Sequence, residues 1–216
     1  MKLAQCKKCF FTLLLIFISS INAINCQAWD RHDLLTKYSL EDVAWLDQFT
    51  AIPVHSFQDA LSKIYAPHFT KDDFSKLHQL NPDFQIRYHD PNNLSQETYA
   101  KVGEITTAKA ILSHYVDEPD LGIDQNLNLS PDQRWMGGTT GPTSRGFRHL
   151  FLKRWSFSAP LRTFHIPPRQ MGEALQRAQL FYTIAEKAFQ AGEHYWAFRF
   201  LAWSLHYIQD LGSPFH

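Results

Sequence analysis

The sequence predicts an all-α domain preceded by a short apolar leader. Two long stretches, 171–192 and 193–212, carry apolar residues at helical spacing and contain few helix breakers. A third stretch, 97–115, shows the same spacing, and we identify no segment whose alternating pattern clearly indicates a half-buried strand. An apolar content of 44% with 19% charged residues is typical of a folded globular chain, and 216 residues suffice for one sizeable core.

The leader covers residues 1–28. A lysine-containing start is followed by a short apolar run, FFTLLLIFI at 10–18, and then by small and polar residues. This order is typical of a secretory signal peptide, and the run is too short to span a membrane as a helix. Cleavage fits after Ala23 or after Ala28, and the second site makes Trp29 the mature N-terminus. We therefore expect an exported protein, extracellular or periplasmic, without a transmembrane segment once the leader is removed.

The composition argues against a disulfide-stabilised domain and against a protein that binds nucleic acid through a basic face. All three cysteines, Cys6, Cys9 and Cys26, precede Trp29, so no disulfide framework is expected in the mature chain. The formal net charge is zero, and removal of three leader lysines leaves 18 of the 21 basic residues against 21 acidic ones. A neutral to mildly acidic chain does not favour nucleic-acid binding through a basic face.

The elements follow in order along residues 29–216. Residues 29–50 begin as a helix, and 51–100 are expected to form short helices and loops because four prolines interrupt them. A helix is predicted over 97–115 and ends in an acidic loop with Pro119 and Gly122. The Gly-rich stretch 136–146 lacks the Gly-Lys-Ser/Thr of a phosphate-binding loop, so we interpret it as a connection. The helix over 171–192 is amphipathic, whereas 193–212 is apolar nearly all round and is predicted to be buried at the domain centre.

The last thirteen residues, SLHYIQDLGSPFH, carry the chemistry. His206 and Asp210 are four residues apart and so share one face of the buried helix, and His216 follows a Gly-Ser-Pro break. A buried imidazole and carboxylate are costly unless they are paired or bind a metal, and together they are zinc ligands. A hydrogen-bonded structural pair is the alternative interpretation.

This stretch resembles the signature H-Y-x-x-D-x-x-x-P-x-H of the bacterial zinc-dependent phospholipase C family, which the P1/S1-type single-strand-specific nucleases share in outline. The preceding text, RAQLFYTIAEKAFQAGEHYWAFRFLAWSLHY, is similar to the paired helices of those phospholipases. The resemblance implies a nearly all-helical phospholipase C/P1 nuclease-like domain over 29–216. It also implies hydrolysis of phosphatidylcholine-like phospholipids at a membrane surface, giving diacylglycerol and a phosphorylated head group.

The same resemblance implies up to three Zn²⁺ ions. Its ligands, matched position by position, are the amine and carbonyl of Trp29, then His32, Asp117, His149, His206, Asp210 and His216. Asp117, in SHYVD, is also the implied catalytic base, and Asp120 remains the alternative for this aspartate. One ion is expected on Asp117, His149, His206 and Asp210, a second on Trp29, His32 and a bridging Asp210, and a third beginning at His216.

The sequence departs from the family pattern at its C-terminal end. The third zinc of the family also takes a histidine and an acid downstream of the position of His216. We therefore expect the sequence to be either a fragment of a longer protein or a truncated product without the C-terminal helices. On its own it is expected to bind fewer than three zinc ions and to be weakly active or inactive. We expect a monomer with no nucleic-acid partner. Three other interpretations stay open: a P1/S1-type zinc nuclease, an inactive truncated paralogue, and a metal-free secreted binding module.

Overall fold

The computed structural model describes residues 31–64, 69–80, 100–127, 129–130, 143–166 and 170–213, and most of them are helical. They belong to one compact unit that begins at Arg31. The expected leader, Trp29, His216 and most of the expected connection at 136–146 lie outside the described residues. Within the described residues, no helix has both the length and the hydropathy that crossing a membrane requires.

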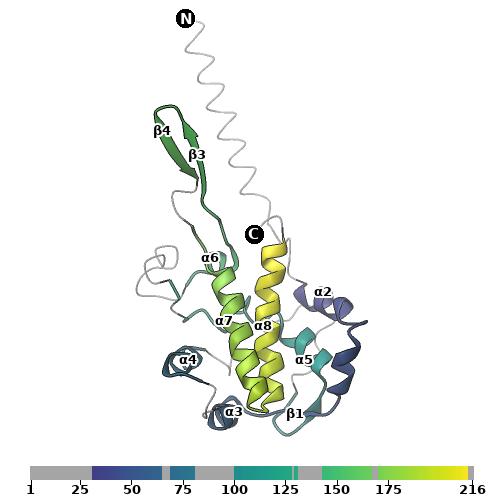
Figure 1. The fold of residues 1–216 in the computed structure, drawn as a ribbon. Helices are drawn as coiled ribbons and strands as arrows, with labels where there is room; N and C mark the ends of the chain where they lie inside the picture. The colour runs from purple at the N-terminus through teal and green to yellow at the C-terminus, as the bar shows by residue number, and fades with distance from the viewer. Residues whose placement is uncertain are drawn as a thin grey trace, which may run out of the picture. The chain divides into compact units, whose positions relative to one another are not determined.

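The centre of the fold is an antiparallel pair of helices, α7 (Ala174–Gln190) and α8 (His194–Gly212), which lie side by side in Figure 1. The short connection between them turns at Gly192, which has a φ of 75°. Helix α8 is buried along most of its length, as its apolar sequence predicts. Edge-to-face ring contacts, such as Phe181 with Trp203, add to the apolar burial that stabilises this pair.

Helix α5 (Ala108–Tyr115) packs against α8, and α2 (His32–Ser39) packs against α5. The predicted single helix over 97–115 is wrong in its described first half. Gly103 has a φ of 90°, which interrupts a helix, and the Thr107 hydroxyl accepts the N–H of Ala110 to begin α5. The residues between them form β2 (Ile105–Thr106), which pairs antiparallel with β1 (Ile52–Pro53).

The helix expected at the beginning of 29–50 is confirmed by α2, which begins at His32. It ends at Ser39 and is followed by a 3₁₀ turn, η1 (Ala44–Gln48). The expectation of short helices in 51–100 is met by α3 (Phe57–Ile64) and α4 (Lys71–Leu77). Helix α4 begins with a reciprocal cap between Thr70 and Asp73.

A β-hairpin lies between α6 (Arg145–His149) and α7, and the sequence analysis missed it. Its strands are β3 (Trp155–Ala159) and β4 (Arg162–Ile166), paired antiparallel. The alternation in WSFSA covers only five residues between proline-containing segments, so its period of two is a weak signal. The fold is therefore mostly helical with two small antiparallel ribbons.

Candidate metal centre

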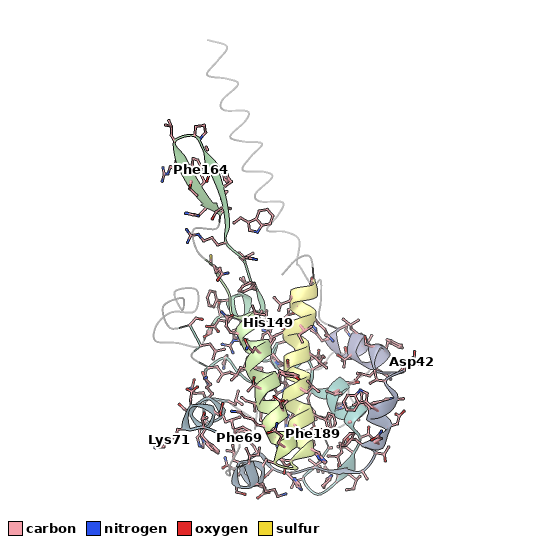
Figure 2. The ribbon with its side chains drawn as sticks, in the orientation of Figure 1. Asp42, Phe69, Lys71, His149, Phe164 and Phe189 are labelled. Carbon is pink, nitrogen blue, oxygen red and sulfur yellow. The ribbon has the colours of Figure 1, made fainter. Side chains whose placement is uncertain are left out.

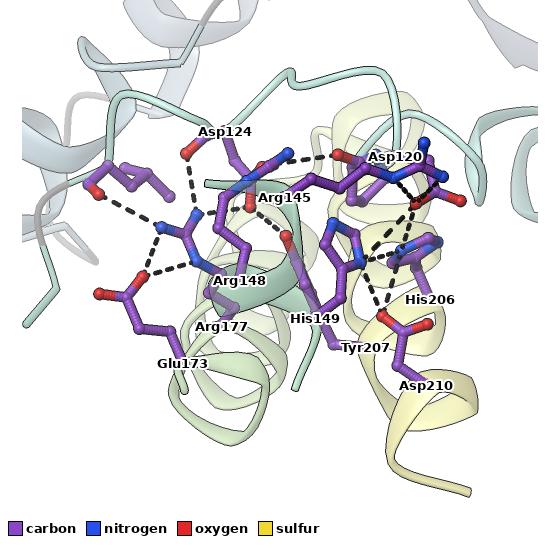
Figure 3. Close-up of polar contacts among 12 residues, drawn as sticks. Asp120, Asp124, Arg145, Arg148, His149, Glu173, Arg177, His206, Tyr207 and Asp210 are labelled. Carbon is purple, nitrogen blue, oxygen red and sulfur yellow. Dashed lines mark hydrogen bonds and ion pairs between the residues drawn. The ribbon is translucent and has the colours of Figure 1, made fainter. Parts of the chain in front are cut away.

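Four separate elements bring histidines and aspartates together at one end of α8. Figure 3 shows four of these residues, Asp120, His149, His206 and Asp210. His32 is the first residue of α2, His149 is the last of α6, and Asp120 lies in the turns after α5. His206 and Asp210 share one face of α8. The three histidines and Asp210 are at most 3% exposed, whereas the Asp120 side chain is 16% exposed.

The first group of donor atoms surrounds one point. His149 Nδ1 lies 2.8 Å from Asp210 Oδ2 and 2.9 Å from His206 Nε2, and His206 Nε2 lies 3.3 Å from the same carboxylate oxygen. Asp120 Oδ1 completes the group at 3.8 Å from His149 Nδ1 and 3.9 Å from His206 Nε2. Ligands about 2.0–2.1 Å from a tetrahedral zinc ion lie about 3.3–3.4 Å apart, and the five separations bracket that value. The donor atoms of His149, His206 and Asp210 can hold one ion, and Asp120 Oδ1 lies at the edge of this group.

A second group of donor atoms lies on the other side of the two carboxylates. His32 Nε2 is 3.5 Å from Asp210 Oδ1 and 3.9 Å from Asp120 Oδ2. Each aspartate therefore presents one oxygen to His32 and the other to the pair His149 and His206. Each carboxylate could thus contribute an oxygen to each of two neighbouring ions.

Gln209 fixes the orientation of His32. Its Oε1 lies 2.7 Å from His32 Nδ1, and its Nε2 donates to Thr36 Oγ1 at 2.7 Å. Because an amide oxygen only accepts, His32 Nδ1 carries the proton and the lone pair of Nε2 is directed at the aspartates. The sequence analysis missed both partners, and their only signals are the helical spacings of Thr36 from His32 and of Gln209 from His206.

The other two histidines are held by packing. The far-side nitrogens, His149 Nε2 and His206 Nδ1, are buried and have no hydrogen-bond partner among the described residues. The His149 ring contacts Tyr207 with centroids 5.1 Å apart, and the His206 ring contacts His32 at 4.1 Å. Ring packing therefore sets which nitrogens face Asp210.

The electrostatics of the cluster suit a cation. Burial lowers the pKa of His32 and, to about 4, that of His149, so both rings are neutral near neutral pH. Burial opposes ionisation of Asp120 and Asp210, but the adjacent histidines hold the pKa of both carboxyls below its usual range. Burial opposes protonation of His206, but its hydrogen bond to Asp210 and the Asp210 charge raise its pKa above the ordinary value. Neutral imidazoles and ionised carboxylates are the forms that bind metal, so a cation would displace the proton of His206. These buried groups can hold a metal ion.

Asp117 and Asp120 were the two candidates for the mid-chain aspartate, and the structure places them differently. Asp120 belongs to both sides of the cluster, and neither donor group includes Asp117. Burial, followed by the charge of Asp33, raises the pKa of Asp117 to about 7, and its Oδ1 has no hydrogen-bond partner among the described residues. The three-residue shift follows from the consecutive turns after α5, which direct the later side chain into the cluster.

A buried ionic network centred on Asp124 lies beside the cluster (Figure 3). Asp124 is paired with Arg148 of α6 and Arg177 of α7, and it accepts the Tyr207 hydroxyl of α8. Arg177 is also paired with Glu173 at 2.6 Å. Because Arg148 and Tyr207 directly adjoin His149 and His206 in sequence, this network fixes the backbone from which two of the cluster histidines project.

Comparison of the chain with family models, with curated proteins and with solved structures found no match. Fold and site together define a mostly helical protein with buried His/Asp groups that can hold a metal.

Proposed function

We propose that the chain is an exported zinc-dependent phosphodiesterase that hydrolyses phospholipids. This proposal is carried by the position of two carboxylates, Asp120 and Asp210, among three buried histidines. In each carboxylate, one oxygen lies near His32 and the other lies near His149. Imidazole nitrogens together with carboxylate oxygens suit zinc better than magnesium or calcium, which prefer oxygen ligands.

The donor groups assign residues to two cations. His149, His206 and Asp210 would hold one, and His32 and Asp120, which form the other group with His206, would contribute to the second. Trp29 and His216, which the family resemblance adds to this set, lie outside the described residues. Such a pair of zinc ions supplies Lewis acidity for phosphodiester hydrolysis.

The protein's own residues determine how a substrate approaches. The cluster is closed on the side of α8, and Asp120 is its most exposed member. Arg145 lies at that edge, with its guanidinium 2.8 Å from Asp120 and a side chain that is 63% exposed. A guanidinium can bind two phosphate oxygens at once, so Arg145 is placed to orient an anionic phosphodiester at the rim of the cluster. Gln209 keeps the proton on His32 Nδ1, away from the reacting side.

The test combines metal analysis with hydrolysis assays on the full secreted chain. We expect bound zinc, hydrolysis of a chromogenic phosphorylcholine ester that stops on chelation, and little cleavage of single-stranded DNA. His206→Ala should lose zinc together with at least about 100-fold of activity. The matched control is His78→Ala, since His78 is an exposed histidine of the α4 end and belongs to neither donor group. Unchanged zinc content and hydrolysis in His206→Ala would contradict the proposal, and preferential cleavage of DNA would assign the site to a nuclease.

A further inference from the structure

The β3–β4 hairpin has two chemically different faces. Residues paired across antiparallel strands project to the same side, and successive pairs alternate. Trp155 pairs with Ile166 and Phe157 pairs with Phe164 on one face. The pairs on the opposite face are polar, with hydrogen bonds from Ser156 to His165 and between Ser158 and Thr163.

The apolar face is open to solvent in the part of the chain that the structure describes. Trp155 is 75% exposed, Ile166 64% and Phe157 54%, and Leu161 at the tip is fully exposed. The rings of Phe157 and Phe164 stack at 5.1 Å, and Figure 2 shows Phe164 among the hairpin side chains. A two-stranded ribbon gains little stability from such a face in water. Large aromatic and aliphatic side chains gathered on one exposed face mark an interaction surface.

The charged residues of the described hairpin and of its base are all basic. No acidic residue occurs between Asp132 and Glu173, although the whole chain has a formal net charge of zero. The described hairpin region carries Lys153, Arg154 and Arg162, and the Arg162 guanidinium lies 5.7 Å from the centre of the Phe164 ring. Basic side chains that flank exposed aromatics match the interface of an anionic bilayer, where aromatic rings enter the head-group region and cations meet lipid phosphates.

We infer that the hairpin is a membrane-docking element that lays its apolar face on an anionic phospholipid surface. Strands of five residues span about 17 Å, well short of the roughly 30 Å hydrocarbon core, so the hairpin lies in the interface and does not cross the bilayer. Pairing with the hairpin of a second copy is disfavoured, because it would bring two wholly basic surfaces together.

The hairpin is joined to the metal centre by a short, anchored connection. Leu152 and Met171 exchange two backbone hydrogen bonds, of 2.8 and 3.2 Å, at the point where the hairpin leaves the helices. His149 precedes Trp155 by six residues, a reach of at most about 20 Å of chain. The short connection would let a membrane-bound hairpin hold the cluster close to phospholipid substrate, and this role rests on the proposed function. Membrane binding by the hairpin can be measured without any activity.

The experiment measures flotation of the full chain with vesicles of phosphatidylcholine alone and of phosphatidylcholine with phosphatidylglycerol. We expect binding to the anionic vesicles that weakens as salt is raised. The double variant Phe157→Ser/Phe164→Ser should lower the partition coefficient at least about tenfold, and Arg162→Gln should lower it about fivefold, equivalent to about 1 kcal/mol for one basic residue. The polar-face variant Ser158→Ala/Thr163→Ala is the matched control and should bind like the parent chain.

The inference would be overturned if the parent chain did not bind anionic vesicles, or if the apolar-face and polar-face variants bound them equally. It would also be overturned if the chain formed a dimer that the Phe157→Ser/Phe164→Ser change dissociated without any effect on vesicle binding. Because these residues are exposed, thermal unfolding should be unchanged in all variants. Activity separates the two proposals. Failure of the hairpin proposal leaves hydrolysis of vesicles intact in the Phe157→Ser/Phe164→Ser variant, whereas failure of the proposed function leaves vesicle binding without hydrolysis of even a monomeric short-chain phospholipid.

Discussion

Asp120 and Asp210 show how single side chains define this site. Each carboxylate has one oxygen near His32 and the other near the pair of His149 and His206. A histidine that binds a metal through one ring nitrogen donates a hydrogen bond from the other. Gln209 accepts that hydrogen bond from His32. The aspartates therefore connect His32 to the other two histidines, and Gln209 determines which His32 nitrogen faces them.

The role of Asp120 can be tested against that of Asp117. Asp120→Asn removes a charge that both donor groups share, so we expect zinc affinity to fall by more than the roughly 10- to 100-fold typical of losing an outer-shell partner. Asp117→Asn should change zinc affinity less than about tenfold, because Asp117 belongs to neither donor group. Competition titration with a zinc-binding dye measures both variants. A large loss in Asp117→Asn with none in Asp120→Asn would assign the ligand to Asp117.

At the scale of elements, the connection between α6 and α7 depends on close backbone approach. Gly172 has a φ of 93°, and a Cβ at this position would lie 2.0 Å from the carbonyl oxygen of Leu150. That carbonyl accepts the N–H of Ala174, the first residue of α7, and Leu150 directly follows His149. A side chain at 172 cannot be accommodated without moving the backbone that carries His149.

Gly172→Ala is therefore expected to be strongly destabilising, and Gly192→Ala is its matched control. Gly192 also has a positive φ, of 75°, but a Cβ there meets nothing within 4 Å. The control should cost only the backbone penalty of about 1–2 kcal/mol, and Gly172→Ala should cost clearly more and also weaken zinc binding. Chemical denaturation of both variants checks this. Equal losses of unfolding free energy would show that the approach of Leu150 is not limiting.

At the scale of the whole molecule, the Asp124 network ties α6, α7 and α8 to the segment after α5. Burial opposes ionisation of Asp124, but the charges of Arg177 and Arg148 and the hydroxyl of Tyr207 lower its pKa to about 2. A buried carboxylate between two arginines contributes little net stability, but removing it leaves uncompensated positive charge. The network therefore serves mainly to fix α6 and α8, which carry His149, His206 and Asp210, relative to α7 and to the segment after α5.

This network predicts a specific acid dependence of stability. Because the pKa of Asp124 in the folded protein lies below its ordinary value of 3.8, its contribution is full above about pH 4 and is lost as the pH falls towards 2. The loss amounts to about 2 kcal/mol. Asp124→Asn should cost about 3–5 kcal/mol at neutral pH and remove this part of the acid dependence.

The measurement is the free energy of unfolding of chelated protein across pH 2–6, so that metal release does not contribute. Asp72→Asn serves as the control, since the Asp72 side chain is 72% exposed and pairs only with Lys76 in the described part of the chain. An acid dependence identical in Asp124→Asn and in the parent chain would show that other groups dominate it.

The sequence by itself determined the helical core. The apolar residues of α8 recur on every side, which requires burial, and the spacing of His206 and Asp210 places both on one helical face because an α-helix repeats every 3.6 residues. Local chemistry also indicated α7 and the short helices between prolines. It did not indicate the hairpin, because five-residue strands are too short to show a clear period of two. It also did not indicate that α5 begins after Thr107, where the capping hydroxyl and the positive φ of Gly103 outweigh the apolar spacing.

The family resemblance already groups His32, His149, His206 and Asp210, and only the tertiary structure decided that Asp120, and not Asp117, lies with them. His32, Asp120 and His149 lie far from α8 in sequence, and no local pattern encodes the turns after α5 that bring Asp120 to the cluster while Asp117 belongs to neither donor group. The same holds for Gln209 against His32 and for the three helices that converge on Asp124. Local sequence sets backbone periodicity and capping over a few residues, whereas a polar cluster assembled from separate elements depends on packing among all of them.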